Sequence, residues 1–202
     1  MTKIIGLTGM SGAGKGAICG LFASHGIPAV DTDAVYHELL LQKNEMTHEL
    51  ALAFGKEILN EQGLVDRRKL SNLIFTHENT PSALHTLNGI THKYIMAKTR
   101  EIVQAHEKAG VPAVLIDAPQ LFEAGVEREC DLVLGIVAPY AICIERIMKR
   151  DGIAEQAAKK RLLSQHDADY FAAHCDEVIV NDGDLDALHR AVCQFICKYG
   201  VK

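Results

Sequence analysis

Short apolar runs recur along the chain, and each ends at glycines or at an acidic or turn-forming residue. Runs of this kind are typical of strands buried on both faces of a parallel sheet. They occupy residues 3–7, 27–30, 111–116, 131–137 and 177–180. Stretches with helical spacing of apolar residues separate them, and this alternation predicts an α/β domain built on a parallel sheet.

The helical pattern is clearest in four segments next to the predicted strands. After the first strand, Ile18 and Phe22 lie four residues apart and give an apolar helix face that ends near residues 25–26. In the C-terminal half, the pattern predicts helices over residues 139–150 and 153–165, and a closing helix capped by Asp184.

A long segment between the second and third strands has only helical pattern. It runs from about residue 35 to residue 110, with breaks at Gly55, Gly63 and residues 79–81. Thr80 followed by Pro81 predicts a helix start, with Thr80 as the N-cap. A helical excursion of this length predicts an inserted substrate-binding region.

Composition narrows the class of protein. The chain has 202 residues, of which 48% are hydrophobic and 23% charged, as in an ordinary globular protein. Its formal net charge of −5 argues against a general nucleic-acid binder, which needs excess Lys and Arg. The sequence has neither a signal-peptide pattern nor an apolar segment of about 18 residues, so we expect a cytoplasmic protein without membrane contact.

Cysteines and histidines show no familiar metal-binding spacing. The cysteines are scattered without a CxxC pair, so neither a zinc ribbon nor a disulfide framework is indicated. We expect them to be reduced and mostly buried, and the histidines to be surface or core residues, since no HExxH pattern occurs. The cysteines are Cys19, Cys130, Cys143, Cys175, Cys193 and Cys197.

The segment GMSGAGKG, residues 9–16, lies between the first predicted strand and the first predicted helix. Its spacing is that of a P-loop, in which backbone N–H groups and a helix N-terminus bind a phosphate chain and Lys15 reaches the outer phosphates. The alternative is a glycine-rich turn with an exposed lysine. The predicted nucleotide-binding residues are Gly9, Met10, Ser11, Gly12, Ala13, Gly14, Lys15, Gly16 and Ala17.

Acidic residues follow two of the predicted strands. Asp31 and Asp33 come after the second strand, and Asp117 ends the third. Parallel α/β proteins bind ligands at this edge of the sheet, where a carboxylate can accept a hydroxyl proton or hold a magnesium-bound water. Asp33 and Asp117 are therefore candidate metal ligands, the alternative being solvated turn residues.

Arginines are spaced for phosphate binding in the predicted helices of residues 139–165. Arg146 and Arg150 lie four residues apart and share a helix face, and Arg161 could join them if the two helices form a hinged lid. A lid would exclude water from phosphoryl transfer. The spacing equally allows a solvated face with ion pairs to neighbours such as Asp151.

Together these stretches resemble the dephospho-CoA kinase family. The Asp-x-Asp after the second strand and the DxPxLxE segment of residues 117–123 are more specific than the P-loop. The matching residues are Gly9, Gly12, Gly14 and Lys15; Asp31–Asp33; Arg67–Leu70; Leu87, Asn88 and His92; Asp117–Glu123; Glu145, Arg146 and Arg150; Arg161 and Gln165; and Asn181 and Gly183.

The resemblance implies a fold and an activity. The fold is a P-loop three-layer α/β/α sandwich with a five-stranded parallel sheet in the order 2-3-1-4-5. The core would comprise residues 1–38, 111–138 and 166–202, the helical CoA-substrate region residues 39–110, and the lid residues 139–165. The activity is ATP-dependent phosphorylation of the 3′-hydroxyl of the dephospho-CoA ribose with Mg²⁺, by a monomer or weak homo-oligomer.

Residue roles also follow from the resemblance. Asp33 would be the base or orient the hydroxyl, while Lys15 and Arg146 would stabilise the transferred phosphoryl group. Arg150 and Asn181 would add to the nucleotide site. The implied substrate-binding residues are Thr8, Asp31, Arg68, His92, Asp117, Leu121, Glu123 and Arg161.

Three positions depart from the family pattern. Gly16 stands where a P-loop normally has the Ser or Thr that binds magnesium, Lys93 replaces the usual Pro after the histidine, and Gln120 interrupts the common DxPLL. Gly-Lys-Gly also occurs in adenylate-kinase-like enzymes, so another small-molecule or nucleoside monophosphate kinase is one alternative. A catalytically weak nucleotide-binding module is the other.

Overall fold

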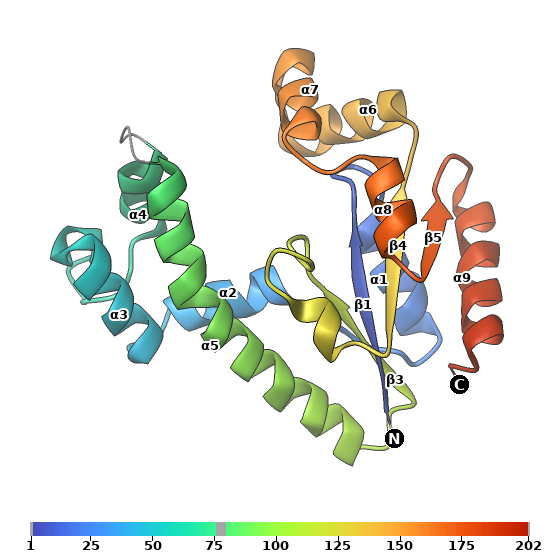
Figure 1. Cartoon of the computed structure of the whole chain (residues 1–202), viewed down its shortest axis with the longest axis horizontal. Helices are drawn as coiled ribbons and strands as arrows, with labels where there is room; N and C mark the ends of the chain where they lie inside the picture. The colour runs from blue at the N-terminus through green and yellow to red at the C-terminus, as the bar shows by residue number, and fades with distance from the viewer. Residues whose placement is uncertain (1, 76–79, 202) are drawn as a thin grey trace. The chain divides into compact units, whose positions relative to one another are not determined.

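The computed structural model describes residues 2–75 and 80–201. The chain divides into two compact units, one made of residues 1–30 and 103–202 and the other of residues 31–102 (Figure 1).

A five-stranded parallel sheet in the order β2-β3-β1-β4-β5 organises the first unit. The central strand β1 pairs with β3 on one side and with β4 on the other, and β4 pairs with β5. The sheet order predicted from the family resemblance is confirmed. The strands are β1 (Lys3–Gly9), β2 (Ala29–Asp31), β3 (Ala113–Asp117), β4 (Leu132–Val137) and β5 (Glu177–Val180).

Helices of the first unit pack on the sheet or extend beyond the carboxyl ends of its strands. Figure 1 shows α6 and α7 together beyond β4, while α8 lies against β4 and β5. The sequence pattern missed α8, a short helix capped by the Asp167 side chain, which accepts from Tyr170 N–H. The helices are α1 (Lys15–Ser24), η2 (Val126–Glu129), α6 (Tyr140–Asp151), α7 (Glu155–Leu163), α8 (Ala168–His174) and α9 (Leu185–Tyr199).

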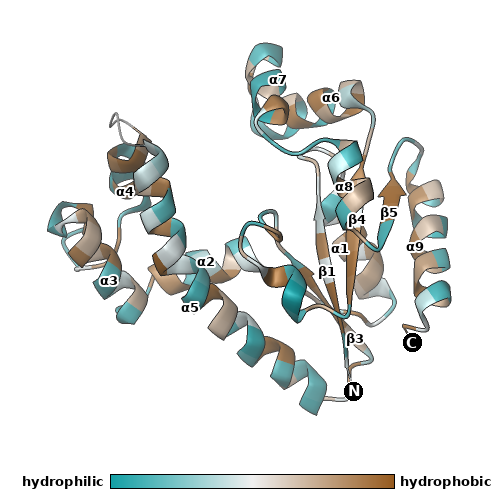
Figure 2. Cartoon of the chain, viewed as in Figure 1, coloured by the Kyte–Doolittle hydropathy of each residue, from teal (hydrophilic) through white to brown (hydrophobic). Residues whose placement is uncertain are grey.

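The core of this unit lies between the apolar strands and the inner helix faces. Strand β4 is brown almost throughout in Figure 2, as expected for a strand covered on both faces. Helices α1 and α9 meet through Phe22 and Phe195, whose rings are 5.8 Å apart in an edge-to-face arrangement. Both side chains are buried.

The expectation of mostly buried cysteines is wrong. All six cysteines lie within the described residues and form no disulfide, but only Cys143 is buried, Cys197 is exposed, and the other four are partly exposed. The two cysteines of α9, Cys193 and Cys197, lie outside its buried stripe of Leu188, Val192, Phe195 and Ile196. Position on an amphipathic helix therefore decides the exposure of these thiols.

The second unit is helical and has its own core. Asn44 and Thr47 form a capping box at the start of α3. Thr80 is the first residue of α5 rather than its N-cap, and Asn79 lies outside the described residues. The elements are α2 (Thr32–Leu40), α3 (Glu45–Phe54), η1 (Lys56–Ile58), α4 (Arg67–Phe75) and α5 (Thr80–Lys108), which continues into the first unit. The buried core residues are Leu40, Met46, Leu50, Phe54, Ile58, Val65, Leu70 and Ile74.

Across both described stretches, 2–75 and 80–201, every helix is too short or too polar to serve as a membrane span.

Candidate active site

The glycine-rich loop begins at the end of β1 and leads directly into α1, the arrangement required for a P-loop. Met10 N–H donates to the Ile136 carbonyl at 3.1 Å, which fixes the loop to β4. Gly14 is the N-cap of α1 with φ 108°, and a Cβ there would lie 2.5 Å from the Asn181 amide nitrogen. Only glycine fits this position without displacing Asn181.

Asn181 and Arg146 hold the same stretch of the loop. The Asn181 side chain is buried and donates to the Ala13 carbonyl at 2.7 Å. Arg146 Nη1 lies 3.3 Å from the Ala13 carbonyl oxygen, 3.5 Å from that of Gly12 and 3.4 Å from that of Asn181. The guanidinium of Arg146 is therefore fixed beside the P-loop, and Asn181 connects the end of β5 to it.

Gln165 is a contact of the P-loop that sequence reasoning did not select. Ser11 N–H donates to Gln165 Oε1 at 3.1 Å, and Gln165 lies just after α7. This bond connects the end of the helices α6 and α7 to the loop. The only sequence signal was the family match of Arg161 with Gln165, four residues later.

Arg150 and Arg161 meet at a carboxylate instead of at the loop. Arg150 donates to both oxygens of Asp151, at 2.7 and 2.9 Å, and Arg161 contacts the same carboxylate. Hydrogen bonds from Arg150 chiefly, and the two positive charges, lower the pKa of Asp151 to about 2. Of the two interpretations of these helices, the ion-paired face describes Arg150 and Arg161, whereas Arg146 lies at the P-loop.

Asp117 ends β3 opposite Leu7 of β1. Its Oδ2 lies 3.6 Å from the Sγ of Cys19, which is on α1 four residues after Lys15 and so on the same helix face. The acid predicted at the strand end is thus in contact with the helix that follows the P-loop. Cys19 is a second neighbour that the sequence pattern did not indicate.

Three other predicted residues of the first unit differ in exposure. Thr8 and Leu121 are 1% and 0% exposed, and Leu121 packs against Gly6 of β1. Glu123 is exposed and its Oε1 lies 3.3 Å from His166 Nε2. Leu121 therefore packs on β1, Thr8 is buried within that strand, and Glu123 is accessible.

Asp31 and Asp33 lie at the start of α2. Asp31 is the N-cap, and its Oδ1 accepts from the N–H groups of Asp33 at 2.9 Å and Ala34 at 3.0 Å. The helix begins at Thr32, about three residues before the start predicted from the sequence pattern, so these acids do not lie in a solvated turn. Aspartate is among the best N-caps, and it starts the helix immediately after the strand. Asp33 is exposed in the first helical turn.

Arg68 and His92 lie on α4 and α5 of the helical unit.

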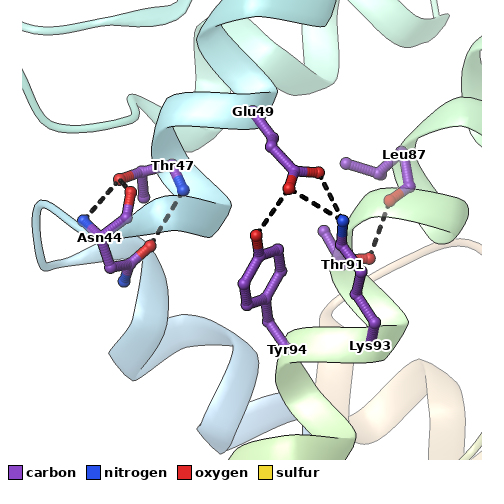
Figure 3. Close-up of polar contacts among 7 residues, drawn as sticks. All are labelled: Asn44, Thr47, Glu49, Leu87, Thr91, Lys93 and Tyr94. Carbon is purple, nitrogen blue, oxygen red and sulfur yellow. Dashed lines mark hydrogen bonds and ion pairs between the residues drawn. The ribbon is translucent and has the colours of Figure 1, made fainter.

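Lys93, which stands where the family usually has Pro after the histidine, has a structural role in this unit. Lys93 Nζ lies 2.8 and 2.7 Å from the two carboxylate oxygens of Glu49 on α3 (Figure 3). The Tyr94 hydroxyl donates to Glu49 at 2.6 Å, and this bond raises the pKa of Tyr94 to about 12. Hydrogen bonds from Lys93 and then Tyr94 lower the pKa of Glu49. The lysine thus connects α5 to α3.

Proteins similar to this chain are known both by sequence and by structure. A family model described as dephospho-CoA kinase matches residues 3–187. A dephospho-CoA kinase of Lactobacillus acidophilus is 32% identical over 200 residues, covering 98% of this chain and 98% of the relative. One of Arabidopsis thaliana is 32% identical over 188 residues, covering 93% and 80%. The solved dephospho-CoA kinase from Campylobacter jejuni has a TM-score of 0.70 and 26% identity, covering 100% of this chain and 98% of that one.

Proposed function

Because the chain belongs to the dephospho-CoA kinase family, we propose that it transfers the γ-phosphate of ATP to the 3′-hydroxyl of the dephospho-CoA ribose. The observation that carries this proposal is the P-loop with Arg146 fixed beside it, within a chain that matches the family from residue 3 to residue 187. Cytoplasmic location and a monomeric or weakly associated state remain predictions.

The donor side of the reaction would use the loop and two cations. Backbone N–H groups at the start of α1 and the Lys15 ammonium would bind the phosphate chain. Arg146 uses Nη1 for its bonds to loop carbonyls, and a guanidinium carries five N–H donors in all. Its other donors are suited to the charge that spreads over the transferred phosphoryl oxygens.

The acceptor side would use Asp33. As the ribose oxygen bonds to the γ-phosphorus and the bond to the ADP oxygen breaks, the hydroxyl proton passes to the Asp33 carboxylate. Asp31 would act through Asp33, because its cap of α2 fixes the first helical turn that carries this carboxylate. Arg68 and His92 would contact the substrate from α4 and α5.

A substrate panel tests this function. We expect ADP release to saturate with dephospho-CoA and to stay at the background rate with AMP, CMP or shikimate, because only the first matches the family. The assay couples ADP release to NADH oxidation, with mass spectrometry of the product. A preference for AMP or CMP would instead support a nucleoside monophosphate kinase, and ATP binding without transfer to any acceptor would support a binding module.

Magnesium fits the residues present only in part. Mg²⁺ prefers oxygen ligands and usually keeps several waters. Asp33 and Asp117 would supply carboxylate oxygens for it or for its waters, but Gly16, the second residue of α1, offers no hydroxyl. When bound, Mg²⁺ would offset the negative charge of the ATP phosphates. We infer that Asp33 and Asp117 would hold it, with water in the place of the missing hydroxyl.

Gly16→Ser is expected to lower the magnesium concentration needed for half-maximal activity about five- to tenfold, equivalent to ~1 kcal/mol of metal affinity. Serine fits because a Cβ at Gly16 would meet no atom within 4 Å. The measurement is a magnesium titration of activity at fixed ATP. Gly16→Ala is the matched control, since it adds the Cβ without the hydroxyl. Identical titrations for the two variants would contradict the missing-ligand interpretation.

A further inference from the structure

Two histidines and a cysteine gather on the first unit where the end of α1 meets α9. His25 is the C-cap of α1, and both His25 and His189 are exposed. His189 and Cys193 are four residues apart on α9 and therefore share a helix face. None of the three has a part in the proposed phosphoryl transfer.

The two sulfur–nitrogen distances in this cluster are those of a metal site. Cys193 Sγ lies 3.5 Å from His25 Nε2 and 3.6 Å from His189 Nε2, and the three ligand atoms all lie within 4.8 Å of one another. In a tetrahedral zinc site with Zn–S of about 2.3 Å and Zn–N of about 2.0–2.1 Å, the sulfur and nitrogen ligands are roughly 3.5–3.6 Å apart. Both sulfur–nitrogen distances therefore already match.

The alternative is a pair of weak hydrogen bonds. A thiol has one proton and can donate to one imidazole, so the other imidazole must donate to sulfur, which is a weak acceptor. The two rings also stack, with centroids 5.6 Å apart and planes inclined by 22°. These contacts would hold the cluster together without a metal ion, and a zinc titration distinguishes the two explanations.

We propose that His25, His189 and Cys193 bind one borderline transition-metal ion of the Zn²⁺ class, with a water in the fourth position. Thiolate sulfur with imidazole nitrogen is a donor set that favours zinc over magnesium or calcium. As the sulfur–metal bond forms, the thiol proton passes to solvent, and the two imidazoles bind through unprotonated nitrogens.

Two of the three proposed ligands could have been noticed in the sequence. His189 and Cys193 have the i, i+4 spacing of ligands on one helix face, but a search for HExxH or CxxC does not find it. His25 lies 164 residues before His189 and joins the group only because α1 packs on α9. Binding would connect the end of the P-loop helix to the C-terminal helix, so the ion should stabilise the folded chain.

Zinc titration of the metal-free full-length chain against a chromogenic chelator tests the proposal. We expect one tight equivalent in the wild type and an affinity at least about tenfold weaker in Cys193→Ser and His189→Ala, since loss of an outer-shell partner alone costs that much. Cys197→Ser is the matched control, because Cys197 is an exposed thiol one turn further along α9. Equal affinity of wild type and Cys193→Ser would overturn the proposal.

Two further readouts are independent of kinase activity. Co²⁺ should give a thiolate-to-metal charge-transfer band in the wild type and in Cys197→Ser, and no such band in Cys193→Ser. Zinc should raise the thermal midpoint of the same two proteins and leave that of Cys193→Ser unchanged, with far-UV circular dichroism checking that each variant folds. A band or a thermal shift that persists in Cys193→Ser, or that is lost in Cys197→Ser, would also overturn the site.

Discussion

Asp33→Asn is expected to lower kcat with dephospho-CoA by about 10²- to 10⁴-fold, the range that a general base contributes. The carboxamide has nearly the same shape as the carboxylate but does not accept the hydroxyl proton. The fold should be unaffected, because the Asp33 side chain is exposed and only its backbone N–H is bonded to Asp31. Steady-state kinetics with dephospho-CoA and with ATP measure the effect on kcat and on both KM values.

Asp31→Asn is the control for this experiment. Asparagine caps helices about as well as aspartate, so α2 and the orientation of its first turn should be preserved. We expect less than a tenfold change in kcat if Asp31 acts by positioning Asp33. An Asp33→Asn enzyme within about threefold of wild type would contradict the base assignment. Equal losses in the two variants would instead indicate that negative charge at the start of α2 is what matters.

The sheet and its loop could be predicted from sequence because local features determine them. Short apolar runs that end in glycine or aspartate indicate buried strands, and a P-loop is specified by glycines and a lysine at fixed spacing. The order of strands came from the family resemblance, since periodicity alone does not say which strands pair. The confirmed order β2-β3-β1-β4-β5 is therefore a success of motif recognition.

Contacts between distant side chains were beyond the sequence pattern. Arg146 and Arg150 lie four residues apart on the same face of α6, yet their partners differ. Arg146 contacts carbonyls of the P-loop, whereas Arg150 donates to the adjacent Asp151. Asn181, which follows β5, contacts both Arg146 and the Ala13 carbonyl, and the sequence pattern does not show this contact. The bond from Ser11 N–H to Gln165 could likewise not be predicted, because only folding brings these two distant residues together.

The P-loop should tolerate no side chain at its first glycine, and we expect Gly9→Ala to destabilise the chain by about 2–5 kcal/mol. Left-handed backbone in a residue other than glycine costs roughly 1–2 kcal/mol, and overpacking adds roughly 1–3 kcal/mol. Gly9 has φ 145°, and its Cβ would lie 2.1 Å from the Ile136 carbonyl oxygen, a backbone atom that has little freedom to move. That oxygen also accepts the Met10 N–H, so the clash would detach the loop from β4.

Urea unfolding measures this loss as a lower midpoint at an unchanged slope, since the surface exposed on unfolding stays similar. The matched control is Gly20→Ala, at an exposed glycine inside α1 whose Cβ would meet no atom within 4 Å. It should stabilise the chain by about 0.5–1 kcal/mol, because alanine is the better helix former. A Gly9→Ala protein as stable as wild type would show that β4 can yield at Ile136. The close approach of the loop to β4 would then not explain the glycine at position 9.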